Sequence, residues 1–120
     1  MIEILFKAKR QDNGEWIQGF YFEFWGACFI LWGMTNDKPN MTEVVPETLC
    51  QYTGTTDENG NKIWENDIVI DDTECGYIKW DSYWSAFAIV FEEYKNHLYR
   101  GEVEVIGNVF DNPELLEVEK

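Results

Sequence analysis

Three segments decide the fold: QYTGTTDENGNKIWENDIVIDD (residues 51–72), GYIKWDSYWSAFAIVF (residues 76–91) and VEVIGNVFDNPELL (residues 103–116). In each, short runs of β-branched and aromatic residues alternate with clusters of Gly, Asn and Asp, a pattern typical of strands separated by tight turns. The pattern predicts strands at 68–70, 77–80 and 86–90 that form a meander. A last strand is expected from residue 103, with a bulge or bend at Gly107, and Asn66 is expected in the left-handed region.

The N-terminal part of the sequence predicts a β-hairpin. Residues 2–9 alternate apolar and polar side chains, as in a strand with one buried face, and Asp12-Asn13-Gly14 provides a turn into a second strand over residues 15–25. A further buried strand is expected at residues 28–32, followed by a flexible loop over residues 35–40.

Two later segments carry weaker patterns. Residues 92–101 favour a loop over a short helix. Asn112 as an N-cap and Pro113 at the first helical position predict one helical turn before residue 116.

The expected fold is mainly β, a small antiparallel β domain in the form of a small barrel or an orthogonal sandwich. We expect residues 1–120 to form one domain, with a β-hairpin region over 1–43 and a barrel-like region over 44–112. With 120 residues and 14.2 kDa, the chain is long enough to bury roughly two thirds of its unfolded surface.

The charge of the chain restricts its partners. It has 23 acidic and 9 basic residues, a formal net charge of −14, and the basic residues are scattered along the sequence. Nucleic acids and anionic membranes are bound first through clustered Lys and Arg, so we expect neither direct nucleic-acid binding nor membrane binding. The longest apolar stretch, residues 20–32, is shorter than the roughly 18 residues of a membrane span.

No catalytic constellation is recognisable. Cys28, Cys50 and Cys75 form no CxxC pair and are expected to be reduced thiols of a cytoplasmic protein, and His97 is the only histidine available as a base. The residues therefore predict a protein that is not an enzyme and needs no cofactor.

The order of several motifs resembles the YopX family of phage and prophage proteins. The motifs are VPETLCQYTG (residues 45–54), DENG (57–60), KIWENDIV (62–69), GYIKWD (76–81), AF (86–87) and EVIGNVFDNPELL (104–116), and the start of the chain, residues 2–10, resembles the family's opening. Trp64 and Asn66 depart mildly from a Tyr-Glu-Gly-Asp stretch of that family. The resemblance implies a compact β fold with an SH3-like barrel in the C-terminal part, a phage or prophage origin in the cytoplasm of a bacterial host cell, and no assigned biochemical activity.

The leading functional hypothesis is a non-catalytic acidic module that binds a host or phage protein. Trp80, Tyr83 and Trp84 flank the end of a predicted strand, where aromatic side chains can hold an extended peptide. An acidic surround favours a basic peptide over a nucleic acid. The exposed strand edges and many aromatic residues also permit a homo-oligomer.

Two alternatives remain open. Asp67, Asp71, Asp72 and Glu74 are close in sequence and offer oxygen ligands for Ca²⁺ or Mg²⁺, which would suit a metal-dependent enzyme. The net charge would also suit a DNA mimic that inhibits a host nucleic-acid-binding protein, if the carboxylates were arranged in phosphate-like rows.

Overall fold

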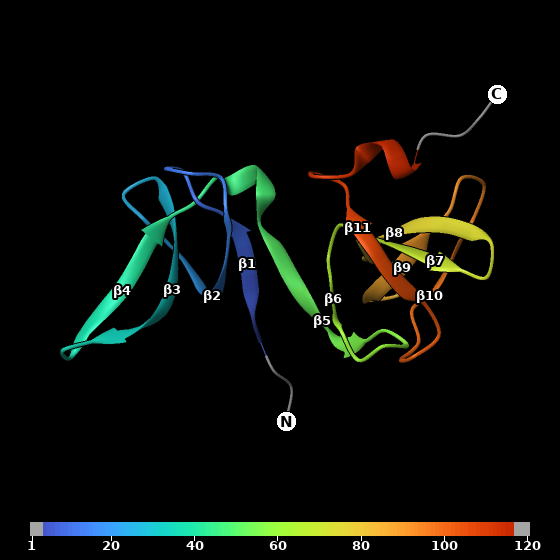
Figure 1. Cartoon of the computed structure of the whole chain (residues 1–120), viewed down its shortest axis with the longest axis horizontal. Helices are drawn as coiled ribbons and strands as arrows, with labels where there is room; N and C mark the ends of the chain where they lie inside the picture. The colour runs from blue at the N-terminus through green and yellow to red at the C-terminus, as the bar shows by residue number, and fades with distance from the viewer. Residues whose placement is uncertain (1–3, 117–120) are drawn as a thin grey trace. The chain divides into compact units, whose positions relative to one another are not determined.

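The chain forms two compact units, Met1–Tyr52 (unit 1) and Thr53–Lys120 (unit 2), and the computed structural model describes residues 4–116. Unit 1 contains β1 (Phe6–Lys9), β2 (Trp16–Phe24), β3 (Ala27–Thr35), β4 (Lys38–Glu43) and the 3₁₀-helix η1 (Pro46–Thr48). Strand β5 (Cys50–Thr56) begins in unit 1 and ends in unit 2. Unit 2 contains β6 (Lys62–Trp64), β7 (Asp67–Asp71), β8 (Glu74–Asp81), β9 (Ala86–Val90), β10 (Lys95–His97), β11 (Glu104–Asn108) and the 3₁₀-helix η2 (Pro113–Leu116) (Figure 1).

The fold is mainly β, with two antiparallel sheets, as the sequence predicts. The boundary between the two units follows Tyr52. The sequence analysis placed the end of the hairpin region at residue 43. No helix among residues 4–116 is long and apolar enough to cross a membrane.

Strand β2 changes partner at Gly19. Its first half pairs with β1, where Trp16 lies opposite Lys9 and Gly19 lies opposite Phe6. Its second half pairs with β3, beginning with Phe20 opposite Leu31. A Cβ atom at Gly19 would lie 2.1 Å from the carbonyl oxygen of Leu31. This close approach of two backbones explains why glycine is needed at the bend.

The predicted N-terminal hairpin is confirmed, although β1 starts at Phe6 rather than at Ile2, which lies outside the described residues. The small core of unit 1 is formed by Ala8, Ile30 and Val44, all essentially inaccessible to solvent. Partly buried side chains pack around them: Phe6, Ile17, Tyr21, Cys28 and Leu49. An isolated bridge between Arg10 and Val44 brings the chain just after β4 against the end of β1.

The flexible loop predicted over residues 35–40 is wrong. Asn36 and Asp37 both have positive φ, 53° and 63°, and together form a tight turn, so that β4 begins already at Lys38. This two-residue geometry matches the right-handed twist of a hairpin and suits Asn and Asp. Strand β4 is an edge of its sheet, and Pro39, opposite Met34, has no N–H to offer a further strand.

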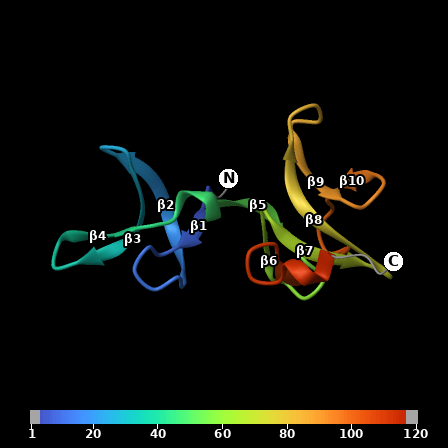
Figure 2. The same cartoon turned by 90° about the horizontal axis from the view of Figure 1, so that it is seen from above.

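Unit 2 is built on a five-stranded sheet with the order β10-β9-β8-β7-β11, seen from above in Figure 2. Strands β7, β8 and β9 form the predicted meander. The left-handed Asn66 is confirmed by its φ of 73°, and the register shift between Val105 and Gly107 confirms the predicted bulge. One face of this sheet covers the core, which comprises Ile63, Val69, Ile78, Ile89, Phe91 and Val103.

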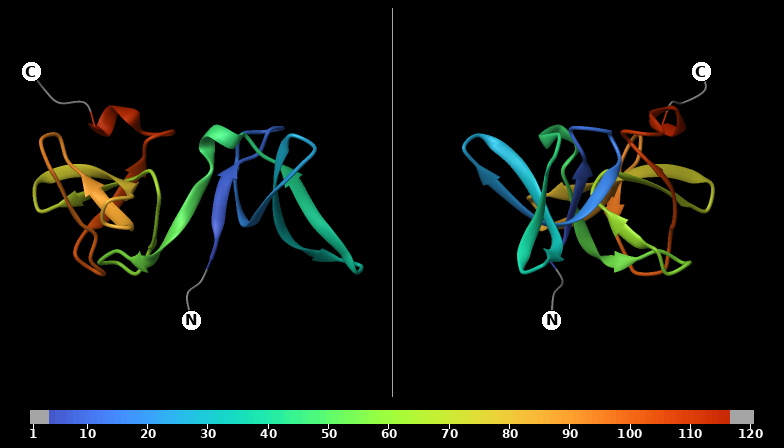
Figure 3. Two further views of the ribbon diagram at one scale, coloured as in Figure 1. Left: turned by 180° about the vertical axis from the view of Figure 1, so that it is seen from behind. Right: turned by 60° about the vertical axis from the view of Figure 1, so that its left-hand side comes forward.

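The barrel predicted for the C-terminal part is not found among the described residues. Strands β10 and β11 are the two edges of an open sheet, and β6 lies beside β5 in the other sheet. The physical reason lies in segment 92–101, where only Lys95–His97 is extended and all three residues are exposed, too short a strand to close the sheet. Residues Pro113–Leu116, where one helical turn was predicted, form η2 beyond the end of β11 (Figure 3).

Loop 57–61 is held by the carboxylate of Asp57, which is only 3% exposed. Its Oδ1 accepts the backbone N–H groups of Asn59 and Asn61 at 2.9 and 2.8 Å, and its Oδ2 accepts that of Val105 at 3.0 Å. Burial alone would raise the pKa of Asp57, but these backbone donors outweigh it, and the pKa lies below its ordinary value. Asp57 therefore ties the loop to strand β11.

Candidate interaction surface

The negative charge is divided unequally between the two units. Residues 1–52 contain seven acidic and four basic residues, whereas residues 53–120 contain sixteen acidic and five basic residues. Unit 1 therefore has a formal charge of −3 and unit 2 a formal charge of −11. Any attraction of a cationic partner is concentrated on unit 2.

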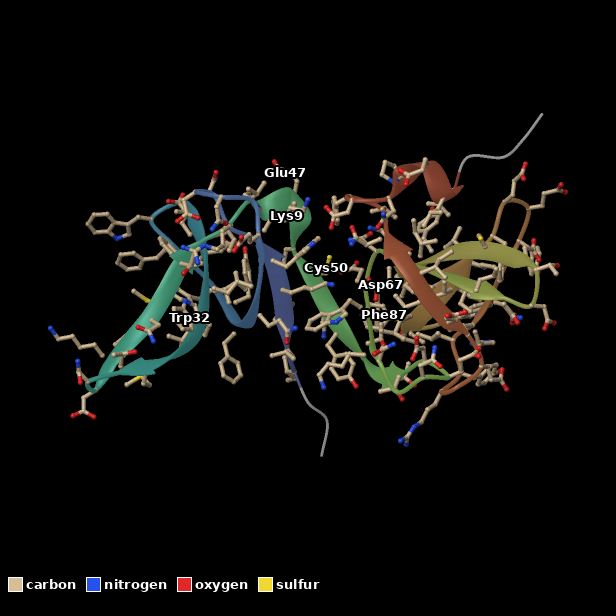
Figure 4. All side chains as sticks on the ribbon, in the orientation of Figure 1. Lys9, Trp32, Glu47, Cys50, Asp67 and Phe87 are labelled. Carbon is tan, nitrogen blue, oxygen red and sulfur yellow. The ribbon has the colours of Figure 1, made fainter. Side chains whose placement is uncertain are left out.

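The structure separates the three aromatic residues that the sequence singled out. Trp80 points to the core face of the β8–β9 hairpin, since it has the same parity as Ile78, and its ring makes an edge contact with Phe87 at 5.1 Å. Phe87, labelled in Figure 4, packs against the core. Tyr83 lies in the turn and is 90% exposed. Trp84 stacks instead on His97 of β10, on the opposite face of the hairpin.

Trp84 is positioned by Asp81, a buried residue at the end of β8. The Oδ1 atom of Asp81 accepts the backbone N–H of Trp84 at 2.9 Å, and its Oδ2 atom forms an ion pair with Lys95. The hydrogen bond from Lys95, followed by that from Trp84, lowers the pKa of Asp81 below its ordinary value. The Lys95 ammonium also lies 5.3 Å from the Trp84 ring centre, a cation–π distance.

Three rings form a row that we call the Trp84 ladder: Trp84, which is half-buried, and the exposed His97 and Tyr99. The Trp84 and His97 rings are 4.0 Å apart and nearly parallel, and the His97 and Tyr99 rings are 6.1 Å apart and tilted. Tyr99 is 54% exposed, and His97 is exposed as well. The sequence analysis did not assign His97 and Tyr99 to an interaction surface, because it predicted a loop for their segment. The alternation Lys95, His97, Tyr99, which places side chains on one face of an extended chain, was the available signal.

A groove of about 350 Å³ lies on the same face of the sheet. Tyr77, Val90 and Lys95 are cross-strand neighbours on β8, β9 and β10. Lys79, Ala88 and His97 form the next row on the same face of the sheet. The groove is lined by Thr73, Glu74, Cys75, Tyr77, Val90, Glu92, Leu115 and Leu116. Its floor is largely apolar, its lining carries two carboxylates and no basic side chain, and Tyr94 donates a hydrogen bond to Glu74 at 2.6 Å.

The carboxylates proposed as metal ligands do not gather. Asp67 is buried, and its Oδ2 atom accepts the backbone N–H of Trp64 at 2.8 Å. Asp71 pairs with Glu74 across β7 and β8. Within residues 4–116, no group of three or more His, Cys, Asp and Glu side chains is arranged to hold a metal ion.

The three cysteines are free thiols. Cys50 is buried on β5 and its sulfur lies 3.2 Å from the carbonyl oxygen of Thr48. Cys28 accepts a hydrogen bond from the Tyr21 hydroxyl at 3.1 Å, and this contact, with a second one to Glu23, raises the pKa of Tyr21.

The comparisons with known proteins agree on the fold. The crystal structure of protein EF1440 from Enterococcus faecalis is similar to this chain, with a TM-score of 0.60 and 22% sequence identity over 98% of this chain and 100% of that chain. None of the curated proteins compared with the chain matches it. A family model described as YopX protein matches residues 5–117. Because that match covers nearly the whole chain, the protein belongs to the YopX family.

Proposed function

We propose that the protein is a non-catalytic interaction module, which binds a basic, extended segment of a host or phage protein on the outer face of β8, β9 and β10. The observation that carries this proposal is the Trp84 ladder, a row of rings in which His97 and Tyr99 are exposed and Trp84 is half-buried, on the unit that has a formal charge of −11. Aromatic rings attract cations through their faces, and clustered carboxylates accept hydrogen bonds from Arg and Lys.

The groove beside the ladder suits the same partner. Long basic side chains have an apolar stem and a charged end. The apolar floor would cover the stem, while Glu74 and Glu92 in the groove lining would accept the charge.

The DNA-mimic alternative draws on the same charge but needs carboxylates in surface rows. Asp57, Asp67 and Asp81 are buried and accept internal hydrogen bonds, so these three carboxylates do not contribute to such a surface. The rings of the Trp84 ladder also have no counterpart in a row of phosphates. Both points favour the peptide-binding proposal.

The test is binding of the purified protein to arrays of nonamer peptides that differ only in having Arg and Lys or Asp and Glu at fixed positions. We expect a preference for the basic peptides that weakens as salt is raised, because screening shortens the range of the attraction. Trp84→Ala should weaken binding at least about fivefold, since aromatic side chains dominate such interfaces.

Trp25→Asn in unit 1 is the matched control and should leave peptide binding unchanged. Equal binding of acidic and basic peptides, or full binding by Trp84→Ala, would contradict the proposal. A variant with Glu74→Gln and Glu92→Gln separates the groove from the ladder, because it removes the two groove charges and leaves the rings in place.

A further inference from the structure

Unit 1 has a second apolar face on the side of its sheet opposite the core. Cross-strand pairing puts Phe20 of β2 beside Leu31 of β3, and Leu31 beside Met41 of β4. Their neighbours in sequence, such as Ile30, point to the core of unit 1. Phe22 and Phe29 form the next pair, with stacked rings 5.4 Å apart, and Phe24 continues the same row. We call these side chains the outer row: Phe20, Phe22, Phe24, Phe29, Leu31 and Met41.

Three side chains of the outer row are exposed, while Phe22, Phe29 and Leu31 are half-buried. Phe20 is 62% exposed, Phe24 57% and Met41 53%. At the Phe20 end, the row borders a groove of about 390 Å³ lined by Leu5, Gln18, Gly19, Phe20, Leu31, Trp32, Gly33 and Met34. This lining contains no charged side chain. Trp32, labelled in Figure 4, is fixed by a hydrogen bond from its Nε1 to Thr42.

Trp25 lies at the opposite end of the row, in the turn between β2 and β3. Its φ is 53°, and Gly26 follows with a φ of 79°, so the turn places a bulky side chain in the left-handed region that favours Gly, Asn or Asp. The Trp25 ring stacks on Phe24 at 5.3 Å and is 93% exposed. A strained backbone that presents a fully exposed indole ring points to a contact that the isolated chain does not make.

We propose that a second copy of this chain covers the outer row. In the pair, a twofold axis passes near Phe22, and the Trp25 turn of each copy enters the groove of the other. The turn and the groove lie at opposite ends of one row, so a single rotation makes both contacts at once, as a self-complementary interface requires. At roughly 3.3 Å per residue, about 15 Å of strand separates the two ends.

The exposed area agrees with a stable pair. Taking about 200 Å² for each fully exposed large side chain, the exposed fractions of Phe20, Phe24, Trp25, Trp32, Met34 and Met41 give about 750 Å² per copy. A stable interface buries about 800 Å² per partner. The core of unit 1, with three fully buried side chains, is also small for its length, so covering this face would stabilise the unit.

The charge distribution favours a second copy over a basic or acidic protein as the partner. The side chains of the outer row are uncharged, and Glu43 of β4 lies beside Phe29 on the same face. Unit 1 has a formal charge of −3, so two copies that meet through this row bring together the less charged parts of a chain whose total is −14. Repulsion between like charges is smaller for this contact than for one made through unit 2. This proposal does not depend on the peptide-binding proposal for unit 2.

The test is sedimentation equilibrium of the full chain at concentrations up to about 100 µM. At that concentration, a dimer with a micromolar dissociation constant would be almost fully formed. We expect a monomer–dimer equilibrium that higher salt does not weaken. Trp25→Asn should raise the dissociation constant at least about tenfold, because the symmetric interface loses two indole rings. Asn accepts the same φ, so the turn itself should persist, which circular dichroism would verify.

Two further variants complete the test. Met34→Lys introduces a charge into the groove and should weaken the dimer as strongly as Trp25→Asn. Tyr83→Asn, which removes an equally exposed ring from unit 2, should leave the dimer unchanged. A wild-type chain that stays monomeric, a Trp25→Asn variant that dimerises as well as wild type, or growth beyond dimers would overturn the proposal.

Discussion

The carboxylate of Asp57 is expected to be one of the largest polar contributions to the stability of unit 2. In Asp57→Asn, the Oδ1 atom can still accept the N–H groups of Asn59 and Asn61, but the new amide group then faces the N–H of Val105, donor against donor. Hydrogen bonds to a charged group contribute about 1.5 to 3 kcal/mol each, and an unpaired buried donor costs about as much. We therefore expect the variant to lose about 2 to 4 kcal/mol of the free energy of unfolding at pH 7.

The pH dependence of this loss follows from the lowered pKa of Asp57. A carboxyl group with a lower pKa in the folded state stabilises the fold above its unfolded pKa, about 3.9 for aspartate, and this contribution disappears as the pH falls through the folded pKa. The difference between wild type and Asp57→Asn should therefore be full at pH 7 and shrink below about pH 4, as the Asp57 carboxylate becomes protonated and neutral like the asparagine.

Urea unfolding followed by tryptophan fluorescence measures both effects, because Trp64 in unit 2 is only 5% exposed and its emission reports on the loss of that core. Glu58→Gln is the matched control, since Glu58 is the exposed neighbour and should change stability by less than about 0.5 kcal/mol. An Asp57→Asn variant as stable as this control at pH 7, or one whose deficit persists unchanged at pH 3, would refute the reasoning.

The remaining predictions concern the bend in β2 and the Asp81 ion pair. Gly19→Ala places a Cβ atom 2.1 Å from the Leu31 carbonyl oxygen and should destabilise unit 1 by at least about 2 kcal/mol, whereas Gly33→Ala, whose nearest neighbour is 3.7 Å away, should cost less than about 1 kcal/mol. Thermal unfolding distinguishes them, and equal melting temperatures would contradict the proposed backbone contact. Lys95→Met should raise the pKa of Asp81, because the ammonium is the main cause of its low value. NMR titration of the Asp81 carboxyl carbon measures this, and an unchanged pKa would assign the effect to the Trp84 N–H instead.

The strands of unit 2 could be predicted because their local signals agree with their tertiary environment. The runs around Ile68, Ile78 and Ile89 are both β-prone and buried, and Asn66 and Gly107 mark irregular positions that few other residues accept. The family could likewise be identified from the order of these motifs, which the match over residues 5–117 confirms.

The errors arose where pairing between strands decides the structure. Residues 35–40 look like a loop by composition, but only Asn36 and Asp37 form the turn, and pairing with β3 holds Lys38, Pro39 and Asn40 extended. Segment 92–101 was predicted to be a loop, and its composition gave no sign of the short strand Lys95–His97 that pairs with β9.

The candidate site was predictable only in part, because position along a strand decides which face a side chain occupies. Trp80 and Trp84 are close in sequence, yet one contacts Phe87 on the core side and the other stacks on His97. The second contact joins residues 13 positions apart through strand β10 and depends on register, which a single sequence does not reveal.

Pro39 on the edge strand β4 bears on the fate of the protein at high concentration. An unprotected edge recruits the same edge of another molecule, and repeated recruitment produces filaments without a defined end. Since a proline there interrupts the ladder and Lys38 places a charge beside it, lateral growth through β4 is blocked. Even at high concentration, the chain would then stay dispersed rather than form fibrils.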